Sequence, residues 1–209
     1  MRRRGTAARL LGVGVLAATL GASVQAAAET PGNAKQGERV FIDKQCFRCH
    51  MPFGEWGGGP KLEALQRRQG VLELTGRLWN HAPAMFEMLK REGHEWPRIT
   101  APEMADLMAY LQAEPSRDPP PDLFQGQVIL VRKGCLKCHS LRGEGGSVGI
   151  EFTKYQGGYD STLVWAAAIW NHSPRMADHA KQMGILYPRF TSKEMVDLYG
   201  YLRHVAAPQ

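Results

Sequence analysis

The sequence lacks a long apolar run. The stretch from Leu10 to Leu20 is shorter than the roughly 20 residues that a membrane-spanning helix needs. Four arginines lie among the first nine residues, and Ala26-Ala27-Ala28 offers a cleavage site of small residues. This pattern is typical of a secretory signal, so residues 1–28 are predicted to be a signal peptide, with an uncleaved anchor as the alternative. We expect no stable membrane span after cleavage and a periplasmic, bacterial location.

A large excess of positive charge is lacking as well. The chain has 26 basic and 20 acidic side chains, but the predicted signal removes four arginines and no acids. The mature chain would then hold 22 basic and 20 acidic groups, a formal charge of +2. Such a balance gives no support to a nucleic-acid-binding function.

Cysteine is also scarce, and all four copies fall in two pentapeptides: Cys46-Phe47-Arg48-Cys49-His50 and Cys135-Leu136-Lys137-Cys138-His139. Both read C-x-x-C-H, which is the attachment pattern for haem c. Two thiols one turn apart can add to the two vinyl groups of one haem, and the next residue falls under the iron. The sequence therefore predicts two covalently attached haem c groups, with His50 and His139 as proximal ligands.

Two other chemistries use paired cysteines. A zinc site could combine both pairs, but zinc sites usually space their pairs more closely and do not require a histidine after each. A dithiol redox motif is expected near a βαβ pattern, which this sequence does not show. The repetition of the whole pentapeptide favours haem over both.

The chain contains an internal repeat that extends beyond the two motifs. Trp79-Asn80-His81 aligns with Trp170-Asn171-His172, and the residues that follow align as well. Between the halves, residues 115–122 are rich in proline and predict a stiff, extended linker. We therefore expect one haem domain at 29–114 and a second at 123–209.

Each half is predicted to open and close with a helix. The opening helices span about 34–44 and 123–132, directly before the haem motifs. The closing helices follow capping boxes at Thr100-Ala101-Pro102-Glu103 and Thr191-Ser192-Lys193-Glu194 and carry an apolar stripe at helical spacing. Gly37 and Gly126 would let the opening and closing helices approach closely.

With these features both halves resemble the class I cytochrome c family. The resemblance implies an all-α fold of two tandem class I cytochrome c domains, each with one covalently bound haem, whose first and last helices cross. In the first half, Gly59-Pro60 is similar to the family's turn, whose proline carbonyl accepts a hydrogen bond from the proximal histidine. The second half has Gly149-Ile150 there, and its carbonyl can still accept.

The distal ligand departs from the family pattern, which places a methionine before a proline ahead of the last helix. Here Trp96 and Tyr187 precede those prolines. We favour the repeated W-N-H-x-P-x-M segment as the source of the ligand, through Met85 and Met176. His81 and His172 are the alternative distal ligands.

That segment has two further expected features. Pro83 and Pro174 predict a kink or restart of the helix, with Asn80 and Asn171 as possible caps. Trp79 and Trp170 are expected to pack against the haem macrocycle.

The predicted function is electron transfer between redox partner proteins through two six-coordinate haems, without enzymatic activity. One alternative is a dihaem redox enzyme, similar to a peroxidase or a thiosulfate dehydrogenase. The lack of a fifth cysteine argues against cysteine ligation, and the matching ligand segments argue against one specialised haem. The other alternative is a cytochrome subunit of a larger dehydrogenase or oxidase complex.

Overall fold

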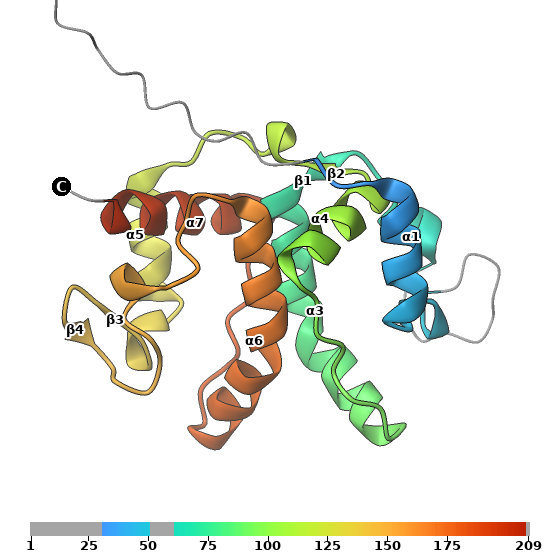
Figure 1. The fold of residues 1–209 in the computed structure, drawn as a ribbon. Coiled ribbons are helices and arrows are strands. Elements are labelled where there is room, and N and C mark those ends of the chain that lie inside the picture. Colours follow the sequence, from blue (N-terminus) through green and yellow to red (C-terminus); the bar gives the residue numbers. More distant parts are fainter. Residues whose placement is uncertain (1–30, 51–60, 208–209) are drawn as a thin grey trace, which may run out of the picture.

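The computed structural model describes residues 31–50 and 61–207. The predicted signal peptide and the Gly59-Pro60 turn lie outside these residues. Two long helices, α3 (Val71–Arg91) and α6 (Thr162–Gln182), lie together near their N-terminal ends in the middle of the molecule and diverge toward their C-terminal ends (Figure 1). The other helices of the first half flank α3, and those of the second half flank α6 (Figure 1). Within the described ranges, no helix is long and apolar enough to cross a membrane.

Each half has the predicted opening and closing helices. The first half opens with α1 (Ala34–Asp43) and closes with α4 (Ala101–Tyr110). The second opens with α5 (Leu123–Arg132) and closes with α7 (Ser192–Ala206). Both predicted capping boxes are present, at Thr100 and at Thr191. The fold is mostly helical, as expected.

Shorter elements complete the fold. The first half adds a 3-10 turn η1 (Cys46–Arg48), α2 (Leu62–Leu65), and β1 (Gln69–Gly70), which pairs in parallel with β2 (Ala113–Glu114). The second adds η3 (Cys135–Lys137), an antiparallel pair β3 (Ser140–Leu141) and β4 (Glu144–Gly145), and η4 (Phe152–Lys154). Each strand is only two residues long, and the two strand pairs join the ends of loops.

The two repeat glycines lie where the opening and closing helices cross. A Cβ atom built at Gly37 would lie 2.0 Å from the Asp106 carbonyl oxygen, and one at Gly126 would lie 2.1 Å from that of Asp197. Side chains from the closing helices also cap the chain ahead of the opening helices, since the Asp197 carboxylate accepts a 2.7 Å hydrogen bond from the Asp122 N–H. The predicted close approach is confirmed.

The linker is tied to the first half. It starts with a 3-10 turn, η2 (Pro115–Arg117). Asp118 then accepts hydrogen bonds from the N–H groups of Leu72 (2.9 Å) and Glu73 (3.1 Å), the second and third residues of α3. These are N–H groups that a helix start leaves without a partner inside the helix, so the linker supplies the cap for α3.

The predicted restart of the helices at Pro83 and Pro174 is wrong. Both α3 and α6 continue through their prolines. Asn80 and Asn171 do not cap a helix either, because their amides bind backbone groups of the opposite half. Packing of α3 against α6 and these side-chain anchors hold the helices in place, which outweighs the local preference of proline.

Two apolar cores are each built from both halves. The first contains Leu163, Ala166, Ala167 and Trp170 of α6 beside residues of the first half. The second contains Leu72 and Trp79 of α3 beside residues of the second half. The two C-x-x-C-H motifs therefore lie in halves that share their apolar cores and do not form separate bodies.

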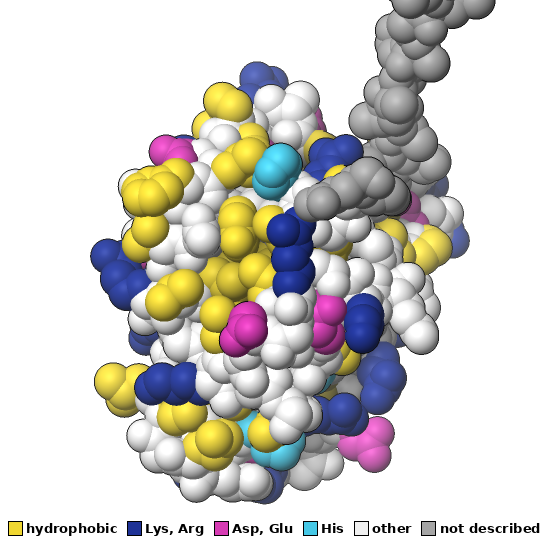
Figure 2. All heavy atoms as spheres, turned by 90° about the vertical axis from the view of Figure 1, so that its left-hand side faces the viewer, with side chains coloured by type: hydrophobic (Ala, Val, Ile, Leu, Met, Phe, Trp, Pro, Cys, Tyr) yellow, Lys and Arg dark blue, Asp and Glu magenta, His cyan; other side chains and the backbone are white. Residues whose placement is uncertain are grey.

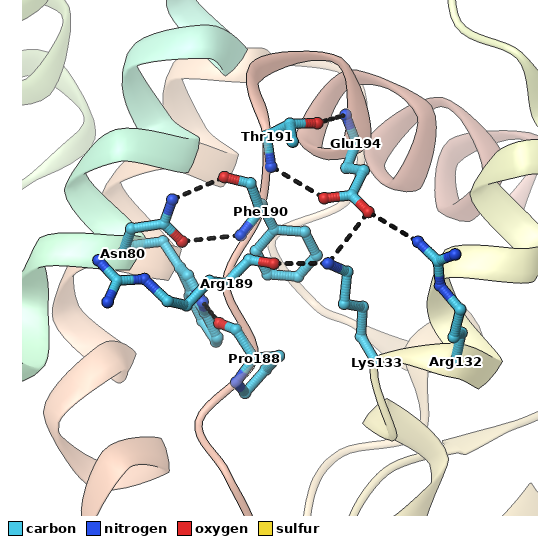
Figure 3. A network of polar contacts seen from close by, with 9 residues as sticks. Asn80, Arg132, Lys133, Pro188, Arg189, Phe190, Thr191 and Glu194 are labelled. Atoms are coloured by element: carbon cyan, nitrogen blue, oxygen red, sulfur yellow. Dashed lines mark hydrogen bonds and ion pairs between the residues drawn. The ribbon is translucent and has the colours of Figure 1, made fainter.

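Hydrogen bonds between the halves follow the repeat. Asn80 donates to the carbonyl of Phe190 (2.6 Å) and accepts from its N–H (2.8 Å), and the Trp79 indole donates to the Pro188 carbonyl (2.6 Å) (Figure 3). Asn171 makes the same pair of bonds with Ile99, and Trp170 donates to Pro97. The long helix of each half thus hydrogen-bonds to the backbone of the segment that precedes the closing helix of the other half.

Replacing Asn80 by alanine should destabilise the protein by about 2–4 kcal/mol, because it leaves the buried N–H and C=O of Phe190 without partners. Urea denaturation monitored by circular dichroism would measure this. Asn171→Ala should cost a similar amount at the corresponding site, and Glu87→Ala, at an exposed position of α3, should cost little. Equal stability of Asn80→Ala and the parent would contradict the role of this contact.

Glu194 connects the capping box of α7 to the end of α5. Its carboxylate accepts from the Thr191 N–H (2.9 Å) and lies 3.1 Å from Arg132 and 3.0 Å from Lys133 (Figure 3). Partial burial acts to raise the pKa of Glu194, but the Thr191 hydrogen bond and the two cations outweigh it and lower the pKa below its ordinary value.

Because this pKa is lowered by folding, the carboxylate stabilises the folded state above the ordinary glutamate range, near pH 4.5. That contribution is lost as the pH falls through the folded-state value. Glu194→Gln should therefore cost about 1 kcal/mol at pH 7, and the difference from the parent should shrink at pH 3. Denaturant titrations at both values test this, with the exposed Glu144→Gln as the control. A difference that stays the same at pH 3 would argue against the ionic contribution.

Candidate haem sites

Both C-x-x-C-H motifs fold into the same turn. The carbonyl of Cys46 accepts from the N–H groups of Cys49 (3.3 Å) and His50 (3.0 Å), and the carbonyl of Cys135 accepts at the same distances from Cys138 and His139. The residue before each motif has a left-handed backbone, with φ of 61° at Gln45 and 75° at Gly134. This conformation ends the opening helix and turns the motif toward the core of its half.

The four thiols are free and partly buried. Burial raises the pKa of Cys46 and of Cys135 to about 11. A redox-active dithiol instead needs a lowered thiol pKa, because the thiolate is the nucleophile. These environments do not fit the dithiol alternative.

The zinc alternative finds no support in the positions of the two motifs. Cys46 packs against the first apolar core, whereas Cys135 packs against the second. Over residues 31–50 and 61–207, no group of three or more histidine, cysteine, aspartate or glutamate side chains is placed to hold a metal ion.

A cavity of about 700 Å³ lies beside the second motif. Cys135, Cys138 and His139 line it on one side, and His172 and Met176 of α6 also line it. Most of the remaining lining is apolar, including Phe152, Trp165, Ile169, Leu198 and Leu202. This size and lining are typical of a cofactor pocket, and the two cysteines stand where a thioether-linked ring would be attached.

The predicted proximal histidine of the second half, His139, is oriented by the backbone. Nδ1 of His139 hydrogen-bonds to the carbonyl oxygen of Ile150 (3.1 Å), and its ring stacks on Phe152 with centroids 4.7 Å apart. The predicted acceptor role of this carbonyl is confirmed. With Nδ1 engaged, Nε2 is left to bind a metal.

Gly149 leaves the room that this ring occupies. A Cβ at Gly149 would lie 2.4 Å from Nδ1 of His139. The residues after the second motif thus form a cradle that a larger side chain would fill, and the site fits a covalently attached haem.

A second histidine lies close to each histidine that is predicted to be a proximal ligand. The ring centroids of His50 and His81 are 6.2 Å apart, and those of His139 and His172 are 6.4 Å apart. Partial desolvation lowers the pKa of His81, His139 and His172, which favours the neutral imidazole that binds metals.

The methionines favoured by the sequence lie one turn further along the same helices. Met85 is partly buried against the first core, and Met176 is partly buried against the second and lines its cavity. Their assignment as distal ligands stays a prediction.

The aromatic residues ahead of the closing helices have a structural role that the sequence did not indicate. Trp96 stacks on Trp170 of the opposite half (4.3 Å), and Tyr187 stacks on Trp79 (4.7 Å). Trp79 also lines the second cavity, although it belongs to the first half. The sequence reasoning missed this exchange, because a repeat shows which residues correspond but not which half each of them contacts.

These two sites can be compared with known families. Residues 34–114 match the family model of Cytochrome c. The match supports a class I c-type cytochrome domain over these residues, and it implies covalently bound haem c and electron transfer. The matched span covers the Cys46–His50 motif and helices α1, α3 and α4, and ends before α5. No curated protein matches the chain.

Proposed function

We propose that this protein is an exported dihaem cytochrome c that passes electrons between redox partner proteins. The observation that carries the proposal is the second cavity, which combines a complete C-x-x-C-H turn, a backbone-oriented histidine and an apolar lining. The cytochrome c match covers the first half, and the second half repeats its motif turn and its helix crossing. The repeat thus supports a second haem in residues 123–209 and the domain boundaries predicted above.

In this proposal Cys46 and Cys49 attach one haem and Cys135 and Cys138 the other, with His50 and His139 as proximal ligands. When bound, each haem supplies a one-electron iron couple. The chain holds the ring in an apolar pocket, fixes the tautomer of His139 and limits access of water. Among the side chains that line the second cavity, Lys154 and Arg175 are suited to pair with haem carboxylates.

The second cavity reaches the surface, which an electron carrier requires. Val148 and Ile150 line it and are 60% and 51% exposed. Figure 2 looks onto the side of α5 and the β3–β4 hairpin and shows apolar side chains across that face, with charged groups around them. A partner protein approaching here would come near the edge of the bound ring. We propose a carrier rather than an enzyme, because the family that matches the first half fits electron transfer.

The test is to purify the mature exported protein and determine its mass and its redox titration. We expect the mass of the chain without residues 1–28 plus two haems, and a titration that involves both irons. Protein that matures in a haem-attaching host and carries no haem would overturn the proposal. Protein with a single haem would overturn its dihaem part.

A further inference from the structure

The facing histidines indicate how each haem is held on its distal side, an inference that rests on the proposed function. Two imidazoles that each bind one metal ion through a bond of about 2 Å have centroids roughly 6 Å apart. The observed separations are 6.2 Å in the first half and 6.4 Å in the second. These separations match the spacing expected of two imidazoles that bind one metal ion from opposite sides.

The same relation occurs twice, in surroundings that differ. His81 is followed by Ala82, and His172 by Ser173. Yet the angle between the two ring planes is similar in the pairs, 61° for His50 and His81 and 67° for His139 and His172. The similar spacing at both sites is expected if the repeated segment of the two long helices presents these rings.

The neighbouring residue fixes each histidine. Asn80 and Asn171 bind both polar groups of a buried backbone unit in the opposite half. Rotation of α3 or α6 about its axis would break these bonds, so the position of the next side chain along the helix is set. A side chain that binds a metal must be held in a fixed position of this kind.

Packing already accounts for the methionines. Met85 packs against the first apolar core and Met176 against the second, which is the common role of methionine on an amphipathic helix. In the second half Met176 also lines the cavity and is the competing ligand.

We propose that His81 and His172 are the distal ligands, so that each haem is held between two imidazoles. Replacing a methionine thioether by imidazole removes a ligand that raises the reduction potential. Both haems would then work at a lower potential than methionine-ligated cytochromes c, and the partners would be donors and acceptors of low potential.

The optical spectrum of the ferric two-haem protein tests this. We expect no sulfur-to-iron charge-transfer band in the parent and unchanged spectra in Met85→Leu and Met176→Leu. His81→Ala and His172→Ala should each convert one of the two haems, either to a high-spin form that binds carbon monoxide when reduced or to a form with a new sulfur band.

A sulfur band in the parent that is lost in Met85→Leu or Met176→Leu would overturn the inference and support the methionine ligands. An unchanged spectrum in both histidine variants would overturn it as well. The parent and leucine spectra decide the question even if a histidine variant fails to fold. Because all these results require haem-loaded protein, they are distinct from the absence of haem, which would end the proposed function itself.

Discussion

Replacing Cys135 and Cys138 together by serine should give a mature protein that carries one haem instead of two. The serine hydroxyls cannot form thioether bonds, so no covalent anchor would remain in the second half. The cavity of about 700 Å³ would lose its covalent occupant, and its apolar lining would be less well packed. Mass spectrometry of the intact protein measures the loss directly.

The mirror variant provides the control. Cys46→Ser with Cys49→Ser should lose the other haem, and all four substitutions together should leave none. A double variant that keeps both haems in its mass would show that the motif does not attach a haem. Loss of both haems from the Cys135/Cys138 variant would instead point to a strict dependence of one half on the other.

Gly126→Ala should lower the free energy of unfolding by at least about 3 kcal/mol, since there is no room for the added methyl group. The new Cβ would lie 2.1 Å from the Asp197 carbonyl oxygen and 2.5 Å from Cβ of Tyr201. Neither atom is at the end of a flexible side chain, so α5 and α7 would have to separate. Alanine is favoured over glycine in a helix by about 1 kcal/mol, so the measured loss would understate the cost of the clash.

The exposed Gln127→Ala, one residue further along α5, is the matched control and should leave stability nearly unchanged. Gly37→Ala should behave like Gly126→Ala, because its Cβ would meet the Asp106 carbonyl oxygen at 2.0 Å. Denaturant unfolding monitored at the far-ultraviolet helix signal compares the three. A Gly126→Ala protein as stable as the control would mean that the helix crossing is looser than described.

Local chemistry made much of the fold predictable. Capping boxes at Thr100 and Thr191 fixed where the closing helices begin, and both are present. The repeat glycines indicated the helix crossing because only glycine allows that approach. The helices do not restart at Pro83 and Pro174, because contacts that the local sequence does not show hold α3 and α6 together.

The sequence predicts the cysteine side of each candidate haem site in more detail than the distal side. Covalent attachment of haem requires one spacing of the cysteines and of the histidine that follows them, so the motif alone predicts that side, and these assignments stay predictions. On the distal side, His81 and Met85 are four residues apart on one helix, and periodicity places both on one face. The direction in which this face points depends on Asn80 binding a segment more than a hundred residues away, so the sequence alone does not choose between the two residues.

The reciprocal contacts of Trp79 with Pro188 and of Trp170 with Pro97 have the form of an isologous interface, in which each surface meets its own counterpart about a two-fold axis. A two-fold dimer of identical subunits is joined in this way, and here residues 115–122 tether the two copies. Duplication of a self-associating ancestor would produce such a chain. Tethering would then have replaced a concentration-dependent association by an intramolecular one and left each haem pocket free to diverge.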